Sequence, residues 1–184
     1  MNDAGTYVVR FLLDVISFLF VVRFLLQACR VDFYNPIAQG FIKATDLVLK
    51  PIRRLLPGYQ NLDFASLVAA ILALIILSYA ISALVGRPAP GFVPVLGSSV
   101  IGTATLIVQI FWWSILAVIL ASFIAPGNTH PVLNLLRQIT EPLLAPARRL
   151  LPAMGGLDFS PILVFLLLGV IQNVVLPQLA QMLF

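Results

Sequence analysis

An internal duplication constrains the fold of this chain more than any other feature. The segment beginning at Asn35-Pro36 recurs at His130-Pro131, an offset of 95 positions that needs no gap. The residues shared by the two copies are Pro36, Thr45, Pro51, Arg53, Arg54, Leu55, Leu56, Pro57, Leu62, Asp63 and Phe64 in the first copy and Pro131, Thr140, Pro146, Arg148, Arg149, Leu150, Leu151, Pro152, Leu157, Asp158 and Phe159 in the second. So many identities in one ungapped register predict two equivalent halves.

The composition predicts an all-α membrane protein. Hydrophobic residues make up 61% of the chain and charged residues only 10%, whereas a soluble domain has about 25% charged residues. The net charge of +4 is clustered, which in a membrane protein indicates anionic lipid head groups and cytoplasmic loops rather than nucleic acid. A single Cys29 and a single His130 argue against an internal disulfide and a His-rich metal site. We expect no cofactor.

Four segments are long and apolar enough to cross a bilayer, which takes roughly 20 residues. We expect these spans at about 7–28, 62–85, 102–124 and 159–182. Residues 86–99, rich in proline and glycine, are expected to connect the halves, so the repeats are 1–88 and 89–184. Each repeat is then helix, basic loop, helix, and the halves should be related by a pseudo-two-fold axis along the membrane normal.

The loops inside the repeats carry most of the positive charge. They contain Arg30, Lys43, Lys50, Arg53 and Arg54 in the first half and Arg137, Arg148 and Arg149 in the second, against Arg87 between the halves. The positive-inside rule therefore places both loops in the cytoplasm and both termini outside. Residues 1–6 lack a basic segment, so no cleavable signal peptide is expected.

Each loop is expected to contain an amphipathic helix, at about 36–50 and 131–145. Asn35 followed by Pro36 is a favourable start, because it provides a capping side chain and then proline at the first helical position. Lys43 and Asp46 share one face and Phe41 lies on another. The helix is expected to lie in the membrane interface with its apolar side down; packing on the protein's own spans is the alternative.

The arginine pairs follow these helices. The prolines that flank them are expected to break the helix and start a new turn. Two roles remain open for Arg53, Arg54, Arg148 and Arg149: structural anchors and topology signals, or a site for lipid phosphate or a partner protein. Other partners for the arginines are Asp63 and Asp158, which we also expect to cap the following spans, beside Ser66 and Ser160.

Polar residues inside the spans need a reason, because an ionised group at a helix centre costs about 2.5 to 3.5 kcal/mol. Asp14 is expected to pair with Arg10 one turn away, and Arg23 to reach lipid head groups. The offset relates Asp14 to Gln109 and Ser78 to Asn173. We expect these four to form a polar layer, which either holds the helices together by hydrogen bonds or lines a path for ions or water.

The chain lacks the residue patterns of an enzyme. It has no glycine-rich phosphate loop, no His/Cys cluster and no nucleophile with a neighbouring base. Asp63 and Asp158 are single carboxylates at helix starts rather than an acid/base pair. We therefore expect no catalytic function.

The second copy, Thr140-Glu141-Pro142-Leu143-Leu144 through Pro152 and then Leu157 to Ser160-Pro161, resembles the signature of the YggT/YlmG family of small bacterial and plastid membrane proteins. The first copy, Asn35-Pro36 and Thr45 to Asp63, is similar but less complete, since Leu47 and Ala65-Ser66 replace family residues. The resemblance implies a tandem-repeat inner-membrane protein without established enzymatic activity. It also implies a link to osmotic stress tolerance, and relatives are linked to cell division or photosynthetic-complex assembly.

Two functions are compatible with these patterns. The first is a membrane organiser that holds anionic lipid or a membrane or cytoplasmic partner protein at its basic loops. The second is a small ion channel or transporter used in osmotic adjustment. A row of small residues that allows close helix packing also leaves self-association open; it consists of Ala65, Ser66, Ala69, Ala70 and Ala73.

Overall fold

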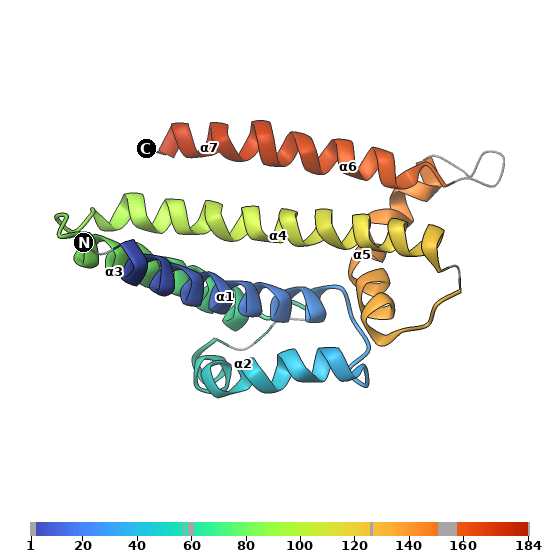
Figure 1. The fold of residues 1–184 in the computed structure, drawn as a ribbon, viewed down its shortest axis with the longest axis horizontal. Coiled ribbons are helices and arrows are strands. Elements are labelled where there is room, and N and C mark those ends of the chain that lie inside the picture. The colour runs from blue at the N-terminus through green and yellow to red at the C-terminus, as the bar shows by residue number, and fades with distance from the viewer. Residues whose placement is uncertain (1–2, 57, 59–60, 126, 151–157, 184) are drawn as a thin grey trace.

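The computed structural model of the 184-residue chain describes residues 3–56, 58, 61–125, 127–150 and 158–183. Its elements are α1 (Asp3–Ala28), α2 (Pro36–Leu55), α3 (Phe64–Val85), α4 (Phe92–Ile124), α5 (Pro131–Leu150), α6 (Ser160–Val170), the π-helical turn η1 (Ile171–Val175) and α7 (Leu176–Leu183). The last three form one continuous rod, and α1 begins at the same end of the molecule where α7 ends (Figure 1). Each half thus runs long helix, amphipathic helix, long helix, which confirms the all-α class.

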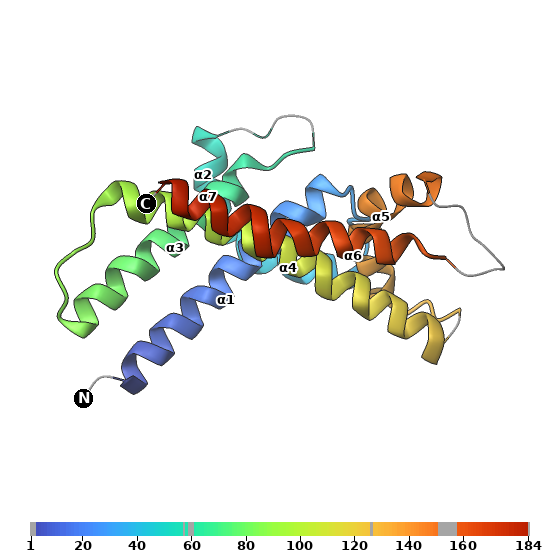
Figure 2. The ribbon, with the colours of Figure 1, turned by 90° about the horizontal axis from the view of Figure 1, so that it is seen from above.

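Three helical segments of the described chain are long and apolar enough to cross a membrane: α3, α4 and the rod Ser160–Met182. Within the most apolar 18-residue stretch of each of these helices, only 17–22% is buried inside the molecule. Most of their hydrophobic surface therefore faces outward, as lipid contact requires. The first predicted span, α1, is not in this set. It is 26 residues long, carries charges such as Arg10, Asp14 and Arg23, and runs beside α3 (Figure 2).

The connector between the halves is shorter than predicted. Helix α4 starts at Phe92, because Pro94 lies in the first helical turn, where a missing N–H breaks no helical hydrogen bond. The expected loop 86–99 is therefore reduced to residues 86–91. Gly86 ends α3 with a left-handed φ of 69°, a conformation that glycine adopts without steric strain. The 33 residues of α4 make a helix about 50 Å long, which exceeds the roughly 30 Å hydrocarbon core.

The prediction that proline ends the amphipathic helices is wrong. Helix α2 continues through Pro51 to Leu55, and α5 continues through Pro142 and Pro146 to Leu150. A proline removes one backbone hydrogen bond and bends a helix without always terminating it, and the last turns of α2 point in a new direction (Figure 1). The arginine pairs therefore occupy the final helical turns, where the negative end of the helix dipole stabilises positive charge.

The two halves pack differently. In the first half the small residues Ala65, Ser66, Ala69, Ala70 and Ala73 are all buried, and three of these alanines pack in one cluster with Val21 and Leu25 of α1. This burial agrees with the close packing expected from the sequence. In the second half larger side chains form the corresponding contact, with Val164 and Leu168 packed beside Ile115 of α4. The first half therefore has less room for a larger side chain.

Candidate functional site: two acid–arginine–acid clusters

In the first half, Arg53 at the end of α2 reaches Asp63, which immediately precedes α3. Its Nη2 donates to Asp63 Oδ2 and its Nε to Oδ1 at 3.4 Å, while Nη1 lies 3.7 Å from Asp46 Oδ1. The Ser66 hydroxyl donates a further hydrogen bond of 2.6 Å to Asp63. The side chain of Asp63 is only 2% exposed, whereas that of Arg53 is 29% exposed, so the acid of this pair is buried and the arginine is partly exposed. We name Asp46, Arg53 and Asp63 the first cluster.

The second half contains the same arrangement at the repeat offset. Arg148 Nη1 donates to Glu141 Oε1 at 2.8 Å and its Nε to Asp158 Oδ2 at 3.2 Å. Asp158 also accepts the backbone N–H of Ser160 at 2.9 Å. Glu141, Arg148 and Asp158 form the second cluster, in which Asp158 is 44% exposed. The two clusters therefore have the same connectivity and very different contact with solvent.

Sequence reasoning named Asp63 and Asp158 as partners of the arginines but missed the partnership of Asp46 and Glu141. The signal was present, because each acid lies seven residues before its arginine on the same helix, a separation of about two helical turns that returns to one face. The predicted cap by Asp63 is not formed, since its side chain bonds no backbone N–H at the start of α3. Its oxygens are occupied by Arg53 and Ser66 instead.

Both aspartates are ionised at neutral pH. Burial alone would raise the pKa of Asp63, but hydrogen bonds from Arg53 and Ser66 and the arginine charge outweigh burial, so its pKa falls below the ordinary value. The pKa of Asp158 is lowered as well: the effect of burial is outweighed by its bonds with Ser160 and Arg148. Burial would lower the pKa of Arg148, but its two acidic partners raise it. Each cluster is therefore a set of ion pairs that links an amphipathic helix to the start of the following long helix.

The second arginine of each pair has a different environment. Arg54 and Arg149 are exposed, and neither forms an ion pair or hydrogen bond with the rest of the described chain. Arg53 and Arg148 thus fasten the amphipathic helices to the following spans, and their neighbours are left for contacts outside the protein.

Arg23 does not extend outward as predicted. It is 4% exposed, and its Nε and Nη1 have no hydrogen-bond partner within the described residues. It lies within electrostatic range of Arg53, Asp63 and Asp46. The first cluster therefore has a buried arginine beside it, whereas the equivalent position in the second half is Val118.

The starts of α2 and α5 are tied together by Asn35. Its Oδ1 accepts the backbone N–H groups of Ile37 at 2.9 Å and Ala38 at 3.4 Å, and its Nδ2 donates to the Pro131 carbonyl at 2.8 Å. The predicted helix start at Asn35-Pro36 is confirmed. The same side chain also joins the two halves, a role that the sequence did not reveal. In the second copy His130 takes this place and its Nδ1 accepts from Val132 at 3.3 Å.

Replacing Asn35 by alanine is expected to lower the free energy of unfolding by about 2 kcal/mol, because both a helix cap and a hydrogen bond between the halves are lost. Asn35→Asp keeps the cap oxygen but loses the donor, so about half of that effect is expected. Unfolding monitored by circular dichroism in detergent measures both. Equal losses in the two variants would show that the cap contributes nothing.

The motif threonines have structural roles. Thr45 Oγ1 donates to the Phe41 carbonyl at 2.8 Å and Thr140 Oγ1 to the Leu136 carbonyl at 3.0 Å. Both side chains are buried, and each hydroxyl is satisfied within its own helix. They fill the contact between the amphipathic helices and the bundle.

The four residues of the predicted polar layer contact different parts of the molecule. Asp14 pairs with Arg10 at 3.8 Å, as expected, with both side chains exposed. Ser78 lines a surface hollow beside Arg10, and Gln109 lines a cavity between the halves. Asn173 Nδ2 donates to the Gly169 carbonyl at 2.9 Å. Within the residues that the structure describes, no hydrogen bond or ion pair joins the four.

A two-fold repeat of long and amphipathic helices, fastened by equivalent ion clusters and covered by outward-facing apolar side chains, defines a tandem-repeat α-helical membrane protein. The chain belongs to the CCB3/YggT family, which it matches over residues 3–84 and again over 97–179.

Bacterial relatives match over nearly the whole chain. An uncharacterised protein of Pseudomonas aeruginosa is 40% identical over 183 residues, which cover 99% of this chain and 93% of the relative. Uncharacterised YggT of Escherichia coli K12 is 36% identical, covering 91% of this chain and 86% of its own length. An uncharacterised Haemophilus influenzae protein is 34% identical, covering 90% and 87%. No solved structure matches.

Proposed function

We propose that this protein organises anionic lipid at one face of the membrane, and that Arg54 and Arg149 contact the head groups. The observation that carries the proposal is that the two arginines of each pair have different contacts. Arg53 and Arg148 are held by internal acids, while the residue that follows each of them is exposed and unpaired within the described chain. A merely structural tie needs one arginine, and the chain has two in both halves.

The chemistry of the exposed arginines suits lipid phosphate. A guanidinium group binds phosphate oxygens through two parallel hydrogen bonds. Each basic residue near an anionic surface contributes about 1 kcal/mol to membrane attraction. Lys43 is also exposed and adds positive charge. Lys50 is paired within the protein instead, because its Nζ lies 3.6 Å from Asp46 Oδ2.

The surroundings are part of the same proposal. The basic loops face the cytoplasm of a bacterial inner membrane, because positive loops are retained on that side. A role in osmotic stress tolerance rests on the family resemblance alone. Lipid organisation at the loops is the molecular activity that we propose as the basis of this role.

The test is a double substitution, Arg54→Gln with Arg149→Gln, in protein reconstituted into nanodiscs of mixed phosphatidylglycerol and phosphatidylcholine. Loss of two contacts is expected to weaken the preference for phosphatidylglycerol about 30-fold, and wild-type preference should fall with added salt. Arg87→Gln is the matched control, because Arg87 is an exposed arginine in the connector between the halves. An unchanged lipid preference in the folded double variant would refute the proposal.

The alternative function, a small ion channel or transporter, is less well supported. A conduction path needs polar groups that follow one another across the bilayer, and Asp14 lies exposed beside Arg10. Potassium flux into liposomes separates the two functions. Flux above that of empty liposomes, lost in Asp14→Asn, would favour the channel; its absence from inserted protein would favour lipid organisation.

A further inference from the structure

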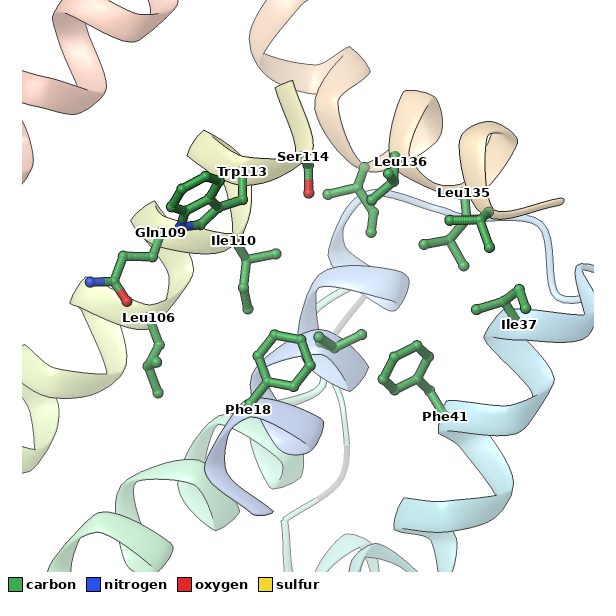
Figure 3. A pocket seen from close by; sticks show the side chains of 13 residues that line it. Phe18, Ile37, Phe41, Leu106, Gln109, Ile110, Trp113, Ser114, Leu135 and Leu136 are labelled. Atoms are coloured by element: carbon green, nitrogen blue, oxygen red, sulfur yellow. The ribbon is translucent and has the colours of Figure 1, made fainter. Parts of the chain in front are cut away.

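A cavity of about 570 Å³ lies where the two halves meet, bordered by α1, α2, α4 and α5 (Figure 3). The repeat offset relates many of its walls to one another. Phe18 faces the cavity from α1 and its equivalent Trp113 from α4; Ile37 and Phe41 of α2 correspond to Val132 and Leu136 of α5. The cavity is therefore bordered by equivalent residues of the two halves. It is separate from the two ion clusters and from the exposed arginines.

The chemistry of the walls limits what can fill this space. The lining is aliphatic and aromatic apart from Gln109 and Ser114. Water gains few hydrogen bonds in an apolar cavity, and an empty one loses the dispersion contacts of its lining atoms. Trp113, which borders the cavity, is 65% exposed, so the space communicates with the outer surface. An apolar molecule that enters from the bilayer matches the apolar lining and can reach the cavity through its open side.

Ser114 adds a second, independent requirement. This residue is 4% exposed, and its hydroxyl points into the cavity (Figure 3). Thr103 and Thr105 on the same helix donate to carbonyls of their own helix at 2.9 Å, but Ser114 forms no hydrogen bond within the described residues. A hydroxyl that faces an apolar cavity finds a hydrogen-bond partner there only in what occupies the cavity, and a hydroxyl left without a partner is unfavourable. The occupant should therefore carry a hydrogen-bonding group at this position in an otherwise apolar body.

We propose that this cavity binds one acyl chain of a membrane phospholipid, with the Ser114 hydroxyl donating to the ester carbonyl of that chain. The volume lies within the range of about 300 to 1,000 Å³ typical of ligand sites. A helix with its side chains is about 10 Å across and does not fit among four helices without separating them, whereas an acyl chain is narrow and flexible. This site is independent of head-group binding by Arg54 and Arg149.

Native mass spectrometry of the purified full chain, released from detergent after incubation with a dipalmitoyl phospholipid, tests the proposal. The wild type is expected to retain one phospholipid. Ile110→Trp fills the cavity and should reduce retention at least tenfold. Leu166→Trp places the same side chain on an exposed position of α6 and should leave retention unchanged. Helical content and unfolding temperature show whether each variant is folded.

The hydrogen bond is tested by comparing ester and ether phospholipids of equal chain length. Ser114→Ala should weaken retention of the ester lipid about two- to tenfold. The ether lipid lacks the carbonyl, so its retention should be the same in the wild type and in Ser114→Ala. Equal sensitivity to both lipids would overturn the assignment of Ser114. Absence of a retained lipid, retention of free fatty acid only, or a dimer that Ile110→Trp dissociates would overturn the phospholipid site.

Discussion

Replacing Arg53 by alanine is expected to lower the free energy of unfolding by about 3 kcal/mol or more, whereas Arg148→Ala should cost less than about 1 kcal/mol. The reason is the burial of the acid that each substitution leaves behind. Asp63 is 2% exposed and would keep a buried charge without its ion-pair partner, while Asp158 is 44% exposed and can be hydrated. The two variants have the same sequence change in the same motif, so their difference reports the burial of Asp63 together with the nearby Arg23, whose equivalent in the second half is Val118.

Unfolding in a mild detergent titrated with dodecyl sulfate measures both variants, and pH adds a second test. In the wild type the lowered pKa of Asp63 gives stability that is present above its ordinary value of 3.8 and is lost as pH falls through the lower folded value. Without Arg53 the hydrogen bond and the charge that lower the pKa of Asp63 are lost, so this pKa rises. The deficit of Arg53→Ala should therefore shrink as pH is lowered from 7 toward the raised pKa of Asp63. A deficit independent of pH would contradict this account.

Ala70→Leu is expected to destabilise the first half by about 1 to 3 kcal/mol, because the added carbon atoms have no space between α1 and α3. Ala70 is completely buried and packs in the cluster that contains Val21 and Leu25. Ala83→Leu adds the same atoms to an exposed position of α3 and should be nearly neutral. Unfolding midpoints of the two variants measure the difference, and equal midpoints would show that the helices separate without cost.

Much of the fold could be predicted because its signals are local or repeated. The offset between Pro36 and Pro131 predicted two equivalent halves, and Asn35 with Pro36 correctly predicted where α2 starts. The errors in the helix boundaries concern proline. Pro94 lies in the first turn of α4 and Pro51 inside α2, since the effect of a proline depends on its position in the helix and on the packing around it.

The candidate site was predictable only in part. The pattern identified Arg53 and Asp63, but whether the arginine binds this acid or a lipid depends on where the end of α2 lies relative to the start of α3. The cavity beside Ser114 has no sequence signal, because its walls come from four helices brought together by tertiary packing. Burial of Arg23 was missed for the same reason: an arginine near a helix end is equally compatible with a membrane surface and with a protein interior.

The length of α4 makes bilayer thickness a structural variable for this protein. A helix of about 50 Å can lie mostly within a hydrocarbon layer only by tilting, and the tilt changes with the thickness of that layer at a cost of a fraction of a kcal/mol per Å. Helix α4 packs against α1 and α3 of the first half and against α5, α6 and α7 of its own half. A thicker or thinner membrane therefore acts directly on the angle between the two halves.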